Sequence, residues 1–391
     1  MEAISPNSED THQSQSKASS SGSPKRRLDY VDLLRGCACL WVMLTHSYNV
    51  AKGQQMLSGS AAFSPQRILF GFSSIGWLGV SLFLVISGFC LFYPMVRKND
   101  PRHIVLDLRE FAWRRAHRIL PPYYIALGVF IVLEAVPQFH LGPLAGVGGL
   151  STKSIFLHLV MLHNLQPDTI DAINVVFWSL ALETQLYFVF PLLAMAGRKF
   201  GLISLVIAAL IVSLAWQFLI YRAYVPTSEM YSVLYRSVPS RAFDFVLGMM
   251  AAVLVARPRT SQTRFALGVG LSLLPFGVWG ALHTSEMPVL VSQSWAVIFA
   301  CLLLIGNRVP MTWFQHPGPK SLTFLGTISY SVYLIHVPFF FLVHPNRLHL
   351  HLSGGETILF NLLRLLLAVG VGYLFFLVAE KPFINRRKAV V

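Results

Sequence analysis

The chain has 391 residues, with 31 lysine and arginine residues against 17 aspartate and glutamate residues. Only 12% of its residues are charged and 54% are hydrophobic, whereas a soluble domain has about 25% charged residues. These proportions exclude a disordered protein, a secreted disulfide scaffold and an ordinary cytosolic enzyme. They indicate a membrane protein with several spans, and roughly ten helices of about 20 residues fit into the chain.

The first segment, residues 1–28, is polar, rich in serine and basic at its end. It lacks the apolar stretch of a signal peptide, so we expect a disordered cytoplasmic tail. Ten apolar runs follow, each long enough or nearly so to cross the bilayer as a helix: 31–51, 70–95, 119–137, 174–196, 201–223, 240–256, 265–284, 289–306, 322–344 and 357–379. The shorter run 154–165 predicts an interfacial or re-entrant helix. The sequence thus predicts an all-α, polytopic membrane bundle over residues 29–385, with a basic cytoplasmic tail at 386–391.

Basic residues predict the orientation of this bundle. If the N-terminus lies inside and ten spans follow, the inner segments carry 22 lysine and arginine residues and the outer loops carry 6. Positive residues gather in cytoplasmic loops, so both termini are expected in the cytoplasm. The net charge of +14 thus reflects topology, and without a water-facing basic domain we expect no nucleic-acid partner. The four cysteines lie in apolar runs without disulfide or zinc spacing, and no metal is expected.

The first run, LDYVDLLRGCACLWVMLTHSY, holds ionisable residues, which are costly in a bilayer and are therefore candidates for function. Arg35 and His46 are eleven residues apart, about three helical turns, so they share one face. Asp32 precedes Arg35 by three residues and is placed to pair with it. An imidazole, which titrates at about pH 6.5, is suited to act as a general base. The simpler alternative places Arg35 and His46 at the two membrane interfaces.

A second group of polar side chains lies in two later runs. Glu183, in FWSLALETQLYFVFPLL, shares a helix face with Ser179 and Tyr187. A carboxyl group in a span is rarely structural, so we predict a functional role or one that orients a histidine. The run LGTISYSVYLIHVPF repeats polar side chains at i, i+4 and i+7, namely Ser329, Tyr333 and His336. Such a stripe also fits hydrogen bonds that hold membrane helices together.

The basic segment EFAWRRAHRILPPYY gives the last candidates, Arg114, Arg115 and Arg118. Guanidinium groups bind phosphate in bidentate fashion, so the cluster is a candidate phosphate clamp. A routine positive flank of a span is the alternative. Arg241 and Asp244 form an i,i+3 pair, for which we favour a structural role. Composition and spacing therefore indicate a membrane protein with a polar interior, either an enzyme or a transporter.

Five segments, taken in order, resemble motifs of the acyltransferase-3 family of integral membrane acyltransferases. They are DLLRGCACLWVMLTH with Arg35 and His46, GVSLFLVISGF, WRRAHRILPPYY, WSLALETQLYFVFPLL, and LGTISYSVYLIHVPFF with the terminal AEKPF. Each segment is weakly specific alone, but the ordered set, over residues 30–385, is highly specific. Two positions depart from the family pattern: Ser81 stands where aspartate is usual, and Thr184 follows Glu183 where many members have a second glutamate.

The resemblance implies a ten-helix core that moves an acyl group, often acetyl, from an acyl-CoA type donor to a hydroxyl group. Acceptors in the family are commonly sugars of surface polysaccharides or lipid-linked glycans, and sometimes small molecules such as macrolides. The resemblance implies His46 as the catalytic base, Arg35 as its electrostatic support and Glu183 as the acid of the motif. Arg115 and Arg118 match a pair linked to donor binding, with Arg114 beside them.

The resemblance, joined to the polar residues found from spacing, predicts an O-acyltransferase that transfers groups other than aminoacyl groups, with acyl-CoA as co-substrate and no cofactor. Acyl-CoA is expected to dock from the cytoplasm on the arginine cluster, and His46 to deprotonate the acceptor hydroxyl inside the bundle. The predicted topology puts His46 in the outer half of the bilayer, which favours an extracytoplasmic or membrane-bound acceptor. Direct transfer and transfer through a covalent acyl-protein are both open. The side chains expected to support the site are Asp32, Ser329, Tyr333 and His336.

The expected location is a plasma membrane or an endomembrane, with the bilayer as a partner of the multi-pass chain. A transporter is the alternative from another class, because polar residues inside spans fit it equally well. Many transporters have inverted repeats and broken helices, and the sequence shows no sign of either, which argues against a transporter. An inactive scaffold on the same fold is a further alternative, against which the intact Arg35 and His46 pair speaks.

Overall fold

The computed structural model describes residues 28–50, 71, 73–98, 106–136, 150–258, 260–283, 289–345, 347–350, 352 and 354–385, and in this part of the chain no strand occurs. Its long helices are α1 (Asp29–Val50), α4 (Leu78–Lys98), α5 (Leu108–Ala135), α7 (Phe177–Phe200), α8 (Leu202–Ala223), α10 (Val238–Ala256), α11 (Thr260–His283), α12 (Val289–Gly306), α13 (Pro317–Leu342) and α14 (Gly354–Phe375). Shorter elements are α6 (Thr152–Leu159), η3 (His163–Leu165), α9 (Glu229–Tyr235), η4 (Met311–Gln315), the π-helical η5 (Phe376–Glu380) and α15 (Lys381–Asn385).

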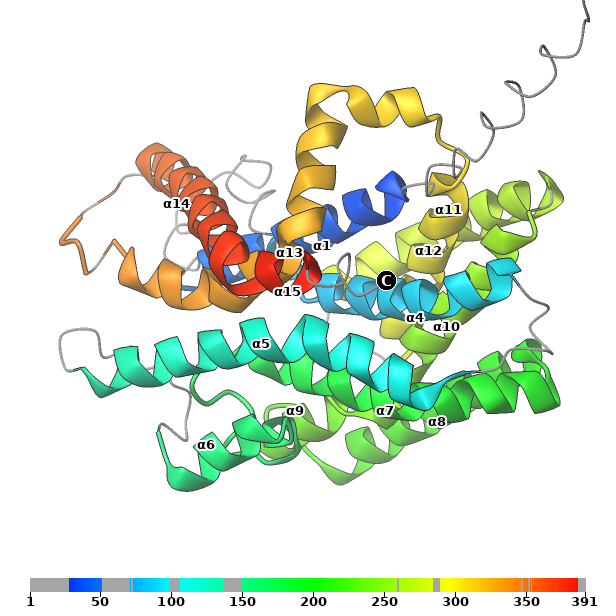
Figure 1. Ribbon diagram of the computed structural model, residues 1–391, viewed down its shortest axis with the longest axis horizontal. Coiled ribbons are helices and arrows are strands. Elements are labelled where there is room, and N and C mark those ends of the chain that lie inside the picture. Colours follow the sequence, from blue (N-terminus) through cyan, green and yellow to red (C-terminus); the bar gives the residue numbers. More distant parts are fainter. Residues whose placement is uncertain are drawn as a thin grey trace, which may run out of the picture.

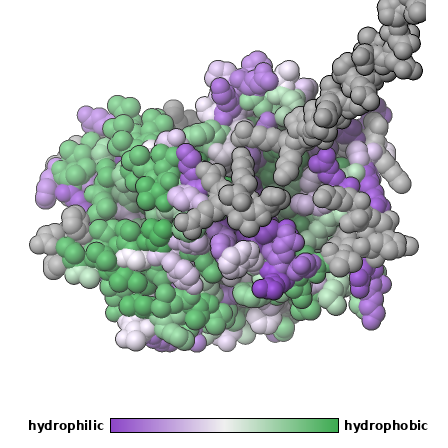
Figure 2. All heavy atoms as spheres, in the orientation of Figure 1, coloured by the Kyte–Doolittle hydropathy of each residue, from purple (hydrophilic) through white to green (hydrophobic). Residues whose placement is uncertain are grey.

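Each of the ten predicted apolar runs overlaps one of the long helices. Seven helices within the described residues are long and apolar enough to cross a membrane by length and composition. Hydrophobic residues cover a broad part of the face seen in Figure 2. The predicted all-α membrane bundle is therefore confirmed, whereas the count of about ten spans and the cytoplasmic termini stay predictions. The predicted tails, residues 1–28 and 386–391, lie outside the described residues except for Leu28.

Helix α5 begins eleven residues before the predicted span 119–137. The carboxylate of Asp107 accepts a hydrogen bond from the backbone N–H of Glu110 at 2.9 Å, which caps the helix. The residues that precede the predicted span, 108–118, are thus helical as well. Hydropathy marks only the part of a helix that hydrocarbon surrounds, while capping decides where the helix starts.

Two helix pairs, α1 with α13 and α4 with α10, pack so closely that their backbones touch. Figure 1 shows α4 and α10 side by side. A Cβ atom on Gly36 would collide with the carbonyl oxygen of Leu322, and one on Gly326 would collide with that of Asp32. Gly88 and Gly248 make the same reciprocal contact between α4 and α10. Small residues allow this approach, which is how membrane helices gain packing and close polar contacts.

Aromatic packing joins this pair to the layer formed by α5 and α7, which Figure 1 shows below α4. The ring of Phe190 on α7 lies 5.3 Å from that of Phe111 on α5, 6.4 Å from Phe92 on α4 and 6.1 Å from Phe245 on α10. All four side chains are buried. Burial of each such ring contributes about 1.5–3 kcal/mol in water, and in lipid the gain comes from packing.

The segment 150–176, between α5 and α7, enters the bundle. Tyr123 and Tyr124, near the middle of α5, donate hydrogen bonds to the carbonyl oxygens of His158 at 3.0 Å and Leu159 at 2.7 Å. The amide of Gln185 on α7 donates to the carbonyl oxygen of Met161 at 3.2 Å. These contacts lie well inside α5 and α7 rather than at their ends. They therefore favour a re-entrant segment over an interfacial helix for the predicted run 154–165.

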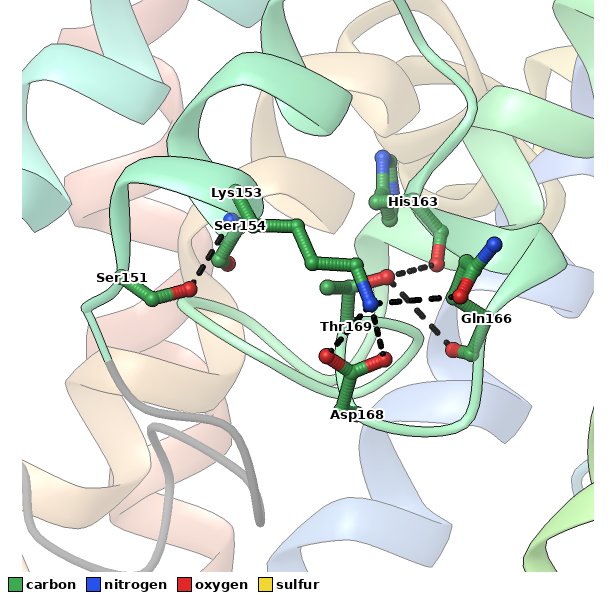
Figure 3. Close-up of polar contacts among 7 residues, drawn as sticks. All are labelled: Ser151, Lys153, Ser154, His163, Gln166, Asp168 and Thr169. Carbon is green, nitrogen blue, oxygen red and sulfur yellow. Dashed lines mark hydrogen bonds and ion pairs between the residues drawn. The ribbon is translucent and has the colours of Figure 1, made fainter.

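Polar contacts also close this segment on itself, as Figure 3 shows. The Lys153 ammonium reaches Asp168 at 2.8 Å and Gln166 at 3.2 Å, and the Thr169 hydroxyl donates to the carbonyl oxygen of His163 at 2.8 Å. The hydrogen bond from Lys153 lowers the pKa of the Asp168 carboxyl. The segment is therefore a folded unit between its two neighbouring helices.

Candidate active site

Helices α1, α4, α5, α7 and α13 line a cavity of about 100 Å³. Six of the ten predicted site residues line it: Arg35, Arg115, Arg118, Glu183, Ser329 and Tyr333. These residues come from four helices that are far apart in the sequence, so the packing of the bundle creates the cavity. The other four predicted residues lie around it, with Arg114 on the outer surface of α5.

Glu183 is held on the cavity wall by two hydroxyl groups. Ser87 on α4 donates to its Oε1 atom at 2.7 Å, and Tyr187 donates to the same oxygen at 2.5 Å. The two hydroxyl groups lie 3.1 Å from each other. These two hydrogen bonds fix the Glu183 side chain in place. Sequence reasoning placed Tyr187 beside Glu183 and missed Ser87, whose only mark was a hydroxyl in an apolar run.

The side chain of Arg35 points from α1 to α4. Its Nη1 atom lies 3.2 Å from the carboxylate of Asp32, as predicted from their spacing, and its Nη2 atom lies 3.3 Å from the sulfur of Cys90. Arg35 therefore adds a positive charge to a cavity that also holds two arginines from α5. Cys90 is a neighbour that sequence reasoning did not identify, because one thiol in an apolar run carries no distinguishing pattern.

His46 and His336, 290 residues apart, meet through their rings. The Nδ1 atom of His46 lies 3.0 Å from the Nε2 atom of His336, and the Nδ1 atom of His336 lies 2.8 Å from the carbonyl oxygen of Tyr333. A carbonyl only accepts, so the hydrogen-bond network assigns the proton of His336 to Nδ1. Its Nε2 atom then accepts the proton on Nδ1 of His46, which leaves Nε2 of His46 unprotonated and suited to act as a base.

The backbone and the side chain of Tyr333 link this histidine pair to the cavity. Tyr333 lines the cavity, and its hydroxyl lies 2.7 Å from the hydroxyl of Ser179 on α7. Its carbonyl oxygen is the partner of His336. Ser329, one turn earlier on α13, lines the cavity and donates to the carbonyl oxygen of Gly326 at 2.9 Å. The predicted stripe on α13 thus both binds helices together and faces the cavity.

The three arginines of α5 do not act as one group. Arg115 and Arg118 line the cavity, and the Arg115 guanidinium lies 6.0 Å from the ring centre of Tyr187. Arg114 instead pairs with Glu110 on the exposed side of α5. Successive residues on a helix are rotated by about 100°, so neighbours in the sequence face different surroundings. The cavity receives two of the three predicted phosphate ligands.

Two further pairs have structural roles. Arg241 and Asp244, both 3% exposed, lie 3.6 Å apart, and Arg241 donates to the hydroxyl of Ser81 on α4 at 3.0 Å. The rings of His158 and His163 stack 3.8 Å apart in the buried part of segment 150–176.

Comparison with known proteins gives a family match over most of the chain. A family model described as an acyltransferase domain, Acyl_transf_3, matches residues 28–378. Peptidoglycan O-acetyltransferase OatA of Listeria monocytogenes is 25% identical over 71% of this chain and 47% of its own length. The putative peptidoglycan O-acetyltransferase YrhL of Bacillus subtilis is 26% identical over 74% and 49%. Acyltransferase MdmB of Streptomyces mycarofaciens is 25% identical over 75% of both chains.

The chain therefore spans about half the length of the first two relatives it matches. No solved structure matches it. The family model begins and ends close to the limits that the motifs indicated, residues 30–385, so the resemblance is confirmed over nearly the whole helical core.

Proposed function

Because the chain belongs to the acyltransferase family whose domain model it matches, we propose that it is an integral membrane O-acyltransferase. It moves an acyl group, with acetyl as the first candidate, from acyl-CoA to a hydroxyl group of a carbohydrate or another small or lipid-linked acceptor. The names of two relatives, a peptidoglycan O-acetyltransferase and a putative one, support a carbohydrate acceptor.

The observation that carries this proposal is the His46 and His336 pair beside a cationic cavity. The pair leaves one nitrogen of His46 unprotonated, which is the property a general base needs. The cavity gathers three guanidinium groups, Arg35, Arg115 and Arg118, around one carboxylate. An excess of positive charge in a partly buried cavity suits the phosphates of a CoA thioester.

In the proposed reaction, Arg115 and Arg118 hold the donor phosphates while the thioester lies in the cavity. His46 takes the proton of the acceptor hydroxyl, whose oxygen attacks the thioester carbonyl. The new C–O bond forms, the C–S bond breaks, and the imidazolium of His46 returns the proton to the leaving thiolate. Arg35 and the Tyr333 hydroxyl, which line the cavity, stabilise the negative oxygen of the intermediate.

The test is acyl transfer by purified protein given radiolabelled acetyl-CoA and a panel of glycan acceptors. We expect His46→Ala to lose about 100- to 10,000-fold in transfer rate, the range for a general base. His316→Ala is the matched control, because His316 is exposed at the start of α13 and lies outside the cavity. Full activity of the His46 variant would overturn the assignment of the base.

A further inference from the structure

Three side chains outside the cavity form a cluster around Arg236. The Arg236 guanidinium lies 2.7 Å from the carboxylate of Asp171, and its central carbon lies 4.9 Å from the ring centre of Trp178. The side chains of Arg236 and Asp171 are 27% and 37% exposed, so both remain accessible. The cluster thus brings a guanidinium, a carboxylate and a half-buried indole ring together.

The cluster lies within electrostatic reach of the proposed base. Arg236 interacts electrostatically with His46 and with Tyr333. Trp178 also precedes Ser179, whose hydroxyl lies 2.7 Å from that of Tyr333. A ligand on the cluster would therefore lie near Tyr333, whose carbonyl oxygen is the partner of His336.

The backbone around Asp171 is fixed to the helix that carries His336. The Asn174 amide donates to the carbonyl oxygen of Leu334 on α13 at 3.0 Å, and its oxygen accepts from the N–H of Val176 at 3.3 Å. Ile173 adopts a φ of 63°, although it is β-branched and buried. This conformation is strained for a β-branched residue and persists where the surroundings impose it. Asp171 is therefore held in a defined place relative to α13.

The cluster also lies apart from the residues assigned to the donor. Arg115 and Arg118 belong to the first turns of α5, whereas Asp171 precedes α7 and Arg236 precedes α10. None of the three cluster residues lines the cavity. The residues proposed to bind the acyl donor thus lie at the cavity, whereas Asp171, Arg236 and Trp178 form a separate polar and aromatic cluster.

We propose that Asp171, Arg236 and Trp178 bind the carbohydrate acceptor, an inference that rests on the proposed function. A sugar ring offers an apolar C–H face, which suits the indole of Trp178. It also offers hydroxyl groups that donate to the Asp171 carboxylate and accept from the Arg236 guanidinium. The cluster sets acceptor specificity and directs one hydroxyl toward His46.

Steady-state kinetics with separate variation of donor and acceptor tests this assignment. We expect Asp171→Asn and Arg236→Gln each to raise the KM for the glycan about tenfold or more. The KM for acetyl-CoA should stay unchanged. Lys153→Met is the matched control: it removes another exposed ion pair of the same segment, Lys153 with Asp168 (Figure 3), and should leave both KM values unchanged.

A charge swap separates acceptor binding from a structural role of the pair. The double variant Asp171→Arg with Arg236→Asp keeps an ion pair and should keep thermal stability, but it should not restore the KM for the glycan. Recovery of that KM, or unchanged glycan KM in the single variants, would overturn the inference while the proposed function stands.

Binding without chemistry gives an independent readout. Saturating quenching of tryptophan fluorescence by N-acetylglucosamine tetramers is expected in the wild type and should be lost in Trp178→Phe. Quenching without acyl transfer to any acceptor would overturn the proposed function alone. Absence of both quenching and transfer would overturn both proposals.

Discussion

Arg114 and Arg115 are adjacent in the sequence but contact different surroundings. Arg115 lines the cavity beside Tyr187, while Arg114 forms a half-exposed ion pair with Glu110 on its own helix. An exposed pair of this kind contributes at most about 1 kcal/mol. A guanidinium inside a partly buried cavity interacts more strongly with a phosphate. The two residues therefore provide a direct comparison of an arginine that lines the cavity with a surface arginine.

We expect Arg115→Ala to weaken acyl-CoA binding and Arg114→Ala to leave it nearly unchanged. Loss of a hydrogen bond to a charged group costs about 1.5–3 kcal/mol, which corresponds to roughly a 10- to 100-fold increase in Kd. Isothermal titration of the detergent-solubilised protein with acetyl-CoA measures the difference. Equal losses in both variants would show that the cluster acts only through its total charge.

Glycines determine how closely the central helices approach. The reciprocal contacts of Gly88 and Gly248 join α4 to α10, and those of Gly36 and Gly326 join α1 to α13. These crossings bring Arg35 and His46 of α1 next to α4 and α13, whose side chains complete the site. The site geometry therefore depends on residues that have no side chain and no chemical role.

We expect Gly248→Ala to destabilise the bundle, because the added Cβ would overlap the carbonyl oxygen of Val85. Overpacking of this kind costs typically about 1–3 kcal/mol. Gly128→Ala on α5 is the control, since a Cβ there meets nothing and alanine is the better helix former. The unfolding midpoint in detergent should fall for the first variant only. Equal unfolding midpoints of the two variants would mean that α4 and α10 can move apart without a loss of stability.

At the scale of the whole molecule, the number of spans and the distribution of lysine and arginine determine the orientation in the membrane. Seven of the described helices satisfy the length and hydropathy of a span, and the ten predicted runs all lie on long helices. An even number of spans would put both termini on one side of the membrane. The distribution of lysine and arginine predicts that this side is the cytoplasm.

Reporters fused to the two ends test this topology. We expect a fluorescent protein that folds only in the cytoplasm to be bright at either terminus. An alkaline phosphatase that needs an oxidising compartment should be inactive at both. Opposite results at the two ends would require an odd number of spans and would reverse the proposed placement of either the arginine cluster or His46.

Much of this molecule followed from local patterns in the sequence. Runs of apolar residues identified the helices because a bilayer demands satisfied backbone groups over about 20 residues. Helical periodicity correctly paired Asp32 with Arg35 and placed Tyr187 beside Glu183. The predicted span 119–137 missed the first eleven residues of α5, because a cap at Asp107 starts the helix before its apolar part.

Only the tertiary structure decided which helix faces meet. The contacts of His46 with His336 and of Ser87 with Glu183 join residues 290 and 96 positions apart. Periodicity shows which side chains share a face, but the partner of that face depends on glycine contacts and aromatic packing spread over several helices. By themselves, composition and local spacing determined a helical membrane protein with candidate polar residues, because both are local properties of the chain. The ordered motifs added the resemblance to the acyltransferase-3 family. The pairing of the histidines and the exclusion of Arg114 required the packed bundle, because both depend on distances between separate helices.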